Sequence, residues 1–149
     1  MITYVVTISK VFPTTHIRKG QQTCFLGLIE RKKKIHTIRG NYDFWAKRFQ
    51  KIERGEACLS IRTWDGVPYY SNQTEHFRLT KEDGIGIQKV LFDDYLYTCN
   101  IDGERFGVNI ENIPANDGLD SKDFESWFRK YDFKKPLAII HFTNFRYKN

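Results

Sequence analysis

Glu56-Ala57-Cys58-Leu59-Ser60-Ile61-Arg62-Thr63 is the stretch that decides the fold class, because it alternates as a half-buried β-strand does. One face carries Ala57, Leu59 and Ile61, and the other carries Cys58, Ser60 and Arg62. Trp64-Asp65-Gly66 follows directly and is a hairpin signal, so we expect the chain to turn back at this point.

Similar short strands are expected on both sides of this one, at residues 2–9, 35–39, 69–80, 85–92, 95–101, 105–110 and 137–142. The turn pairs Asp83-Gly84, Asp93-Asp94 and Asp102-Gly103 separate the middle strands. Residues 137–142 are almost continuously apolar, which suits a central strand. Short strands at this spacing indicate an antiparallel barrel or a curled sheet.

Two helices are expected before residue 56. A short helix within residues 21–31 leads into a basic run. A longer helix follows Asn41, which is a good N-terminal cap, and Gly55 stands where that helix should end. Its apolar stripe consists of Trp45, Phe49 and Ile52.

A third helix should begin at Asp120-Ser121-Lys122-Asp123. It carries Phe124, Trp127, Phe128 and Tyr131 at the spacing of one helix face. We expect this stripe to be core, with an aromatic platform for a ligand as the alternative.

Length and composition are those of a single globular domain spanning residues 1–149. Neither a signal peptide nor a membrane-spanning run is recognised, so we expect a cytoplasmic protein with no membrane partner. Three widely spaced cysteines and four histidines fit neither a disulfide framework nor a metal site. No dinucleotide loop or P-loop is present, and we expect no metal and no cofactor. The oligomeric state is left open.

The net charge of +6 is unevenly distributed. Residues 1–64 hold 13 Lys and Arg against 4 Asp and Glu, a balance of +9, whereas residues 65–149 hold 11 against 14, a balance of −3. A concentrated positive field attracts polyanions, so RNA or a nucleotide-like small molecule is the expected partner. The alternative is a solvated basic surface that binds nothing anionic.

The basic half contains Lys34-Ile35-His36-Thr37-Ile38-Arg39, where we expect the functional site. In a strand, Thr37 and Arg39 project to one face and Lys34 to the other, so Lys34 needs a bend at the start of the strand to join them. The alternative is that the preceding basic run stays in water at a helix C-terminus.

Two segments of the chain resemble the ASCH (activating signal cointegrator homology) domain, a branch of the PUA-like superfamily. The first is Lys34-Ile35-His36-Thr37-Ile38-Arg39, similar to the lysine, threonine and arginine signature of the family. The second is Asp117-Gly118-Leu119-Asp120-Ser121-Lys122-Asp123-Phe124-Glu125-Ser126-Trp127, which looks like the acidic-glycine-hydrophobic turn and helix before the final strand of the family. The resemblance spans most of the chain. It implies an α+β fold, a PUA-like and mostly antiparallel β-barrel with a few helices at the rim.

The resemblance also implies a cleft that receives RNA or a modified nucleoside. One branch of the family is an amidohydrolase that acts on acetylcytidine through a lysine, a threonine and a glutamate. On that motif the catalytic residues would be Lys34, Thr37 and Asp117. The chain departs from the pattern at Lys32, where glycine is usual, and at Asp117, which is one methylene shorter than glutamate.

A lysine that acts as a base near neutral pH needs its pKa lowered by roughly three units, about 4 kcal/mol, which burial can supply. Thr37 would then be the nucleophile. An exposed Lys34 would instead stay charged and contact phosphate. The burial of Lys34 therefore distinguishes catalysis from binding.

Further ligand contacts are predicted at Arg39, Arg62, Trp64 and Tyr70. The arginines could contact phosphate or a base edge, with a plain surface position as the alternative for Arg62. The aromatic rings could stack on a base, but packing within the fold is the interpretation that we favour for both. Three hypotheses remain open: an RNA- or nucleotide-binding domain with a basic cleft, an amidohydrolase that removes an acyl group from a modified nucleoside, and a protein-interaction module.

Overall fold

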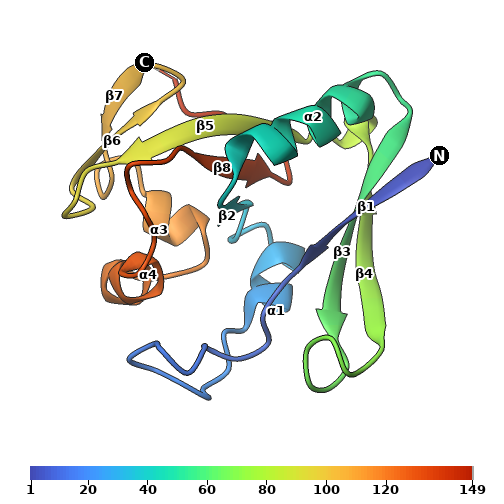
Figure 1. The fold of residues 1–149 in the computed structure, drawn as a ribbon, viewed down its shortest axis with the longest axis horizontal. Coiled ribbons are helices and arrows are strands. Elements are labelled where there is room, and N and C mark those ends of the chain that lie inside the picture. Colours follow the sequence, from blue (N-terminus) through green and yellow to red (C-terminus); the bar gives the residue numbers. More distant parts are fainter. Residues whose placement is uncertain (149) are drawn as a thin grey trace.

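The computed structural model describes residues 1–148 and contains eight strands in two sheets with four α-helices, an α+β fold (Figure 1). The strands are β1 (Ile2–Thr7), β2 (His36–Arg39), β3 (Ala57–Trp64), β4 (Gln73–Leu79), β5 (Gly86–Phe92), β6 (Thr98–Ile101), β7 (Glu104–Gly107) and β8 (Leu137–His141). The helices are α1 (Phe25–Glu30), α2 (Tyr42–Glu53), α3 (Ile113–Asn116) and α4 (Ser121–Phe128), and one 3-10 turn, η1, covers Lys81–Asp83.

The smaller sheet has the order β1-β3-β4. β3 is central and buried along nearly its whole length, on both faces, rather than half-buried as its alternation predicts. β4 returns antiparallel to β3 after the predicted turn, whereas β1 pairs with β3 in parallel.

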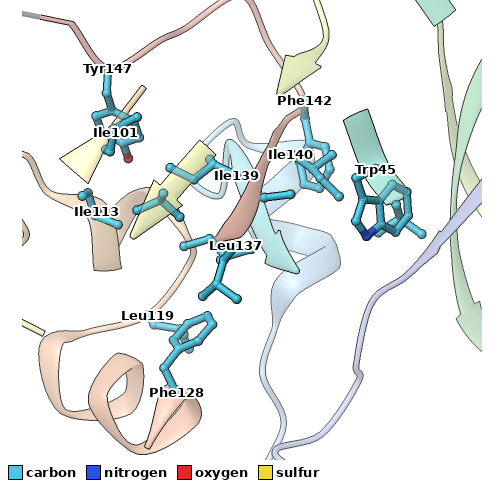
Figure 2. Close-up of a cluster of buried hydrophobic side chains, with 14 of the residues drawn as sticks. Trp45, Ile101, Ile113, Leu119, Phe128, Leu137, Ile139, Ile140, Phe142 and Tyr147 are labelled. Carbon is cyan, nitrogen blue, oxygen red and sulfur yellow. The ribbon is translucent and has the colours of Figure 1, made fainter. Parts of the chain in front are cut away.

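The larger sheet has the order β2-β8-β5-β6-β7, and all its pairs are antiparallel. β8 is buried at every residue and lies between β2 and β5, in agreement with its apolar sequence. Figure 2 shows that side chains on the two faces of this strand pack in different directions. Ile140 points toward Trp45 of α2, whereas Leu137 points toward Leu119 and Phe128.

α2 bridges the two sheets, since it contacts β3 of one and β5 and β8 of the other. Its N-terminus is as predicted: the Asn41 side chain accepts a hydrogen bond from the Phe44 backbone N–H at 3.4 Å. Trp45, Phe49 and Ile52 are buried, and Gly55 follows with a φ of +76°. Local signals therefore placed this helix correctly.

The predicted barrel is not confirmed. Within residues 1–148 the strands pair as two separate sheets and do not close on one another, although buried side chains from both form one apolar cluster. The mostly antiparallel character is confirmed, with β1 and β3 as the parallel exception.

Of the helices in the described part of the chain, none combines the length and the apolar character needed to cross a lipid bilayer.

Candidate functional site

Lys34 is turned into the protein by a tight bend after α1. The backbone N–H groups of Lys33 and Lys34 both donate to the carbonyl oxygen of Leu28, at 2.8 and 3.0 Å. Lys32 has a φ of +58°, a left-handed conformation that glycine adopts without strain. It is the position at which the ASCH domain usually has glycine. The bend predicted before β2 is therefore present, and it leaves Lys34 only 2% exposed.

The Lys34 ammonium group lies against Asp117. Its Nζ donates to the Asp117 backbone carbonyl at 2.6 Å and lies 3.3 Å from Asp117 Oδ1. It also lies 4.3 Å from the centroid of the Phe25 ring. Burial lowers the pKa of Lys34; the Asp117 carboxylate opposes this shift, and the nearby charge of Arg39 adds to it. The amine is thus held in one position, and it loses its proton more readily than a lysine in water does.

Gly118 allows this close contact. Its φ is +82°, and a Cβ built there would lie 3.1 Å from Cδ and 3.2 Å from Cβ of Lys34. Two residues before Gly118, the backbone carbonyl oxygen of Asn116 accepts a hydrogen bond from the Ile35 N–H at 2.8 Å. The Asp117-Gly118 turn after α3 is therefore bound to the segment that carries Lys34, although 83 residues separate Lys34 from Asp117.

A small pocket of about 50 Å³ opens beside these groups. Thr37, Arg39 and Asp117 line it together with Lys34, so four of the seven predicted site residues meet at one place. Thr37 is buried, and Arg39 donates to the backbone carbonyl of Thr7. Burial lowers the pKa of the Arg39 guanidinium.

A chain of buried polar groups lies behind the pocket. His36 Nδ1 is 3.2 Å from Asp117 Oδ1, and His36 Nε2 is 2.7 Å from the Tyr147 hydroxyl. Burial lowers the pKa of His36, so its ring is neutral at pH 7. An ionised carboxylate only accepts hydrogen bonds, so Nδ1–H donates to Asp117 and Nε2 accepts from Tyr147. The Asn116 amide donates to the Tyr147 oxygen at 3.0 Å and completes the chain.

A second and larger hollow, about 580 Å³, adjoins the small pocket, since both are lined by Ile8 and Ser9. Trp64 and Tyr69 stand at its wall with their ring centroids 5.1 Å apart. The predicted contact Trp64 thus lies beside the site rather than in the small pocket.

The remaining two predicted contacts line neither hollow. Arg62 bonds to Ser60 Oγ at 2.9 Å and to Gln73 Oε1 at 3.3 Å on the small sheet. Tyr70 is 90% exposed on the loop between β3 and β4. Their ligand roles stay predictions.

The aromatic stripe of α4 has two parts. Phe124 and Phe128 are core residues, as expected, whereas Trp127 and the following Tyr131 are half-buried and line the small pocket. The core interpretation is therefore confirmed for Phe124 and Phe128, whereas a ligand platform at Trp127 and Tyr131 stays a prediction. His36 and Tyr147 were not predicted as site residues, because strand alternation places His36 on the face opposite Thr37.

No group of three or more His, Cys, Asp or Glu side chains placed to hold a metal ion occurs within residues 1–148. Comparison of the chain with known protein families, with curated proteins and with solved structures found no match.

Proposed function

We propose that this protein is a PUA-like hydrolase of the ASCH type, which removes an acyl group from a modified nucleoside such as acetylcytidine. The observation that supports this most is the burial of Lys34 in a pocket that it shares with Thr37 and Asp117. Lys34 is 2% exposed and its ammonium group donates to Asp117, so a phosphate group in solvent would have to displace that contact to reach it.

In the proposed reaction, the neutral amine of Lys34 takes the proton from the hydroxyl of Thr37. The oxygen of Thr37 then attacks the acyl carbonyl carbon, and the bond to the exocyclic nitrogen of the base breaks. That nitrogen takes a proton from Lys34 and leaves as a free amine. Water then hydrolyses the Thr37 ester, which releases the carboxylic acid and restores the hydroxyl. Asp117 holds the Lys34 side chain throughout.

The sizes of the two hollows suit a substrate of two unequal parts. Pockets that hold whole ligands usually span roughly 300–1,000 Å³, so the small pocket of about 50 Å³ admits an acyl group and not a nucleobase. The adjoining hollow of about 580 Å³ has room for the base, with Trp64 available for stacking. Tyr69 offers a second ring at the same wall.

The second candidate is binding of RNA or a nucleotide-like molecule without chemistry. It is favoured by the larger hollow, which has aromatic residues at its wall and Lys10 on its rim. In this case Lys34 and Asp117 would form a structural ion pair, and Arg39 would contact the bound ligand.

The deciding experiment measures release of cytidine from acetylcytidine by the purified protein and by Thr37→Ala. We expect Thr37→Ala to lose at least about 100-fold in kcat while its affinity for acetylcytidine, measured by calorimetry, changes little. Thr74→Ala is the matched control, since Thr74 is exposed on β4. Undiminished turnover by Thr37→Ala would remove Thr37 as the nucleophile. Binding of acetylcytidine by a protein that never hydrolyses it would favour the second candidate.

Lys34→Met tests the base. The substitution keeps most of the side-chain volume and removes the amine, so the catalytic hypothesis predicts loss of turnover in a protein that remains folded. Circular dichroism verifies folding. Retention of turnover in Lys34→Met would show that another group takes the proton.

A further inference from the structure

A separate groove of about 510 Å³ is lined by residues of α2 and β1, and the reaction proposed above does not use it. Its lining residues are Tyr4, Phe44, Lys47, Arg48, Gln50, Lys51 and Arg54. Tyr4 belongs to β1 and Arg54 caps the C-terminus of α2, whereas the other five lie within α2. None of them is among the three α2 residues that are buried in the core. The groove is therefore a surface feature.

The groove is strongly basic. Four of its seven lining residues are cationic and none is acidic. Arg54 lies 3.8 Å from Glu56, whereas Lys47, Arg48 and Lys51 have no carboxylate within 4.0 Å among residues 1–148. Lys47 and Lys51 are one helical turn apart and repel each other, which destabilises a helix slightly. Three positive charges thus lie close together on the groove without nearby carboxylates to neutralise them.

Aromatic rings hold one of the cations in place. The Arg48 guanidinium carbon lies 4.1 Å from the Phe44 ring centroid and 4.7 Å from that of Tyr4. Such contacts orient a guanidinium while leaving its N–H groups able to donate. Phe44 remains 45% exposed beside the cations. The groove therefore combines positive charge with a partly exposed aromatic ring.

We propose that this groove binds a single-stranded nucleic acid, with phosphates on Lys47, Arg48 and Lys51 and a base stacked on Phe44. Positively charged grooves with exposed aromatic rings bind single strands, because the charges track the backbone and the rings stack on bases. Lys47 and Lys51 are separated by about 6 Å along the helix axis, a step comparable with that between successive phosphates. An anionic lipid surface would not need the ring, and an acidic peptide would not need a stacking face.

The test is fluorescence anisotropy of a labelled single-stranded oligonucleotide with Lys47→Glu/Lys51→Glu. The matched control is Lys134→Glu/Lys135→Glu, which makes the same change in net charge at exposed residues between α4 and β8. We expect the groove variant to lose about 10-fold or more in affinity, and its slope of log affinity against log salt to fall by about 1.4, for two phosphate contacts on a single strand. Phe44→Ala should weaken binding without changing this slope.

Equal losses in the groove variant and the control would mean that only net charge matters, and would overturn the proposal. So would the absence of oligonucleotide binding, or binding to phosphatidylserine vesicles alone. The proposal does not rest on hydrolysis. Thr37→Ala should bind the oligonucleotide normally, and Lys47→Glu/Lys51→Glu should hydrolyse a free acylated nucleoside normally, so either idea can fail alone.

Discussion

Acid should destabilise this protein through His141, whose ring is buried and incompletely hydrogen-bonded. Its Nε2 donates to Gln88 Oε1 at 2.9 Å, while its Nδ1 is buried without a partner in the described structure. Burial lowers the pKa of His141 from 6.5 to about 2, and the neighbouring His36 and Arg146 act in the same direction. The folded protein therefore excludes a proton that the unfolded chain binds.

The sign and size of the effect follow from this difference. Between pH 6.5 and pH 2 the unfolded state binds more protons at this residue, so the free energy of unfolding falls as the pH falls. The loss approaches about 1.36 kcal/mol per pH unit below pH 6.5, and it amounts to roughly 2.7 kcal/mol on going from pH 7.5 to pH 4.5. That is a large part of the 5–15 kcal/mol typical of a domain.

The assay is urea unfolding followed by tryptophan fluorescence at pH 7.5, 6.5, 5.5 and 4.5. His141→Gln keeps a donor for Gln88 and does not titrate. Its stability deficit relative to the natural sequence should therefore shrink by about 2–3 kcal/mol between pH 7.5 and pH 4.5. Asn100→Ala, at an exposed position of β6, is the control, because neither residue titrates and its curve should run parallel to that of the natural sequence. If the His141→Gln curve also runs parallel, His141 does not exclude the proton and the reasoning is refuted.

Three further substitutions test the packing around the pocket. Gly118→Ala should cost about 1–2 kcal/mol in urea unfolding, because of its left-handed φ and the contact with Lys34, and it should lower turnover as well; unchanged stability would contradict this account. Tyr147→Phe removes the donor to His36 Nε2 and should cost about 1–3 kcal/mol, whereas a smaller loss would mean that water replaces the hydroxyl. Phe124→Ala empties a fully buried position and should cost about 3–5 kcal/mol by thermal unfolding, with a loss below 1 kcal/mol as the contrary result.

The parts of the fold that sequence could predict are those with local signals. Asn41 and Gly55 bracket α2, and the apolar run of β8 indicated a central strand, because caps and periodicity are read within one element. α3 was not predicted, because a helix of four residues is too short to show a periodic apolar pattern. Local signals could not predict the parallel pairing of β1 with β3 or the two separate sheets, because both depend on which strands pair across long stretches of the chain.

The site was predictable to a similar extent. Lys34, Thr37 and Asp117 were identified through the resemblance, and they do meet. Neither His36 nor Tyr147 carries a recognisable pattern, because each is a buried polar residue whose partner lies far along the chain. Trp127 was expected to be a core residue, because it belongs to the apolar stripe of α4, and its place in the lining of the pocket was therefore not predicted. A sequence pattern shows which face of an element is apolar. It does not show which residues of that face line a pocket instead of packing in the core.

The place of β2 at the edge of the larger sheet bears on the order in which the protein folds. Within residues 1–148, β2 pairs only with β8, and its residue His36 stands opposite His141, 141 − 36 = 105 positions later. Closing so long a loop costs roughly 2 kcal/mol more than closing a hairpin of ten residues. During synthesis, the segment that carries Lys34 has no strand to join until β8 has been made. We expect a molecule interrupted before that point to possess an ordered α2 and β3 but no ordered pocket around Lys34.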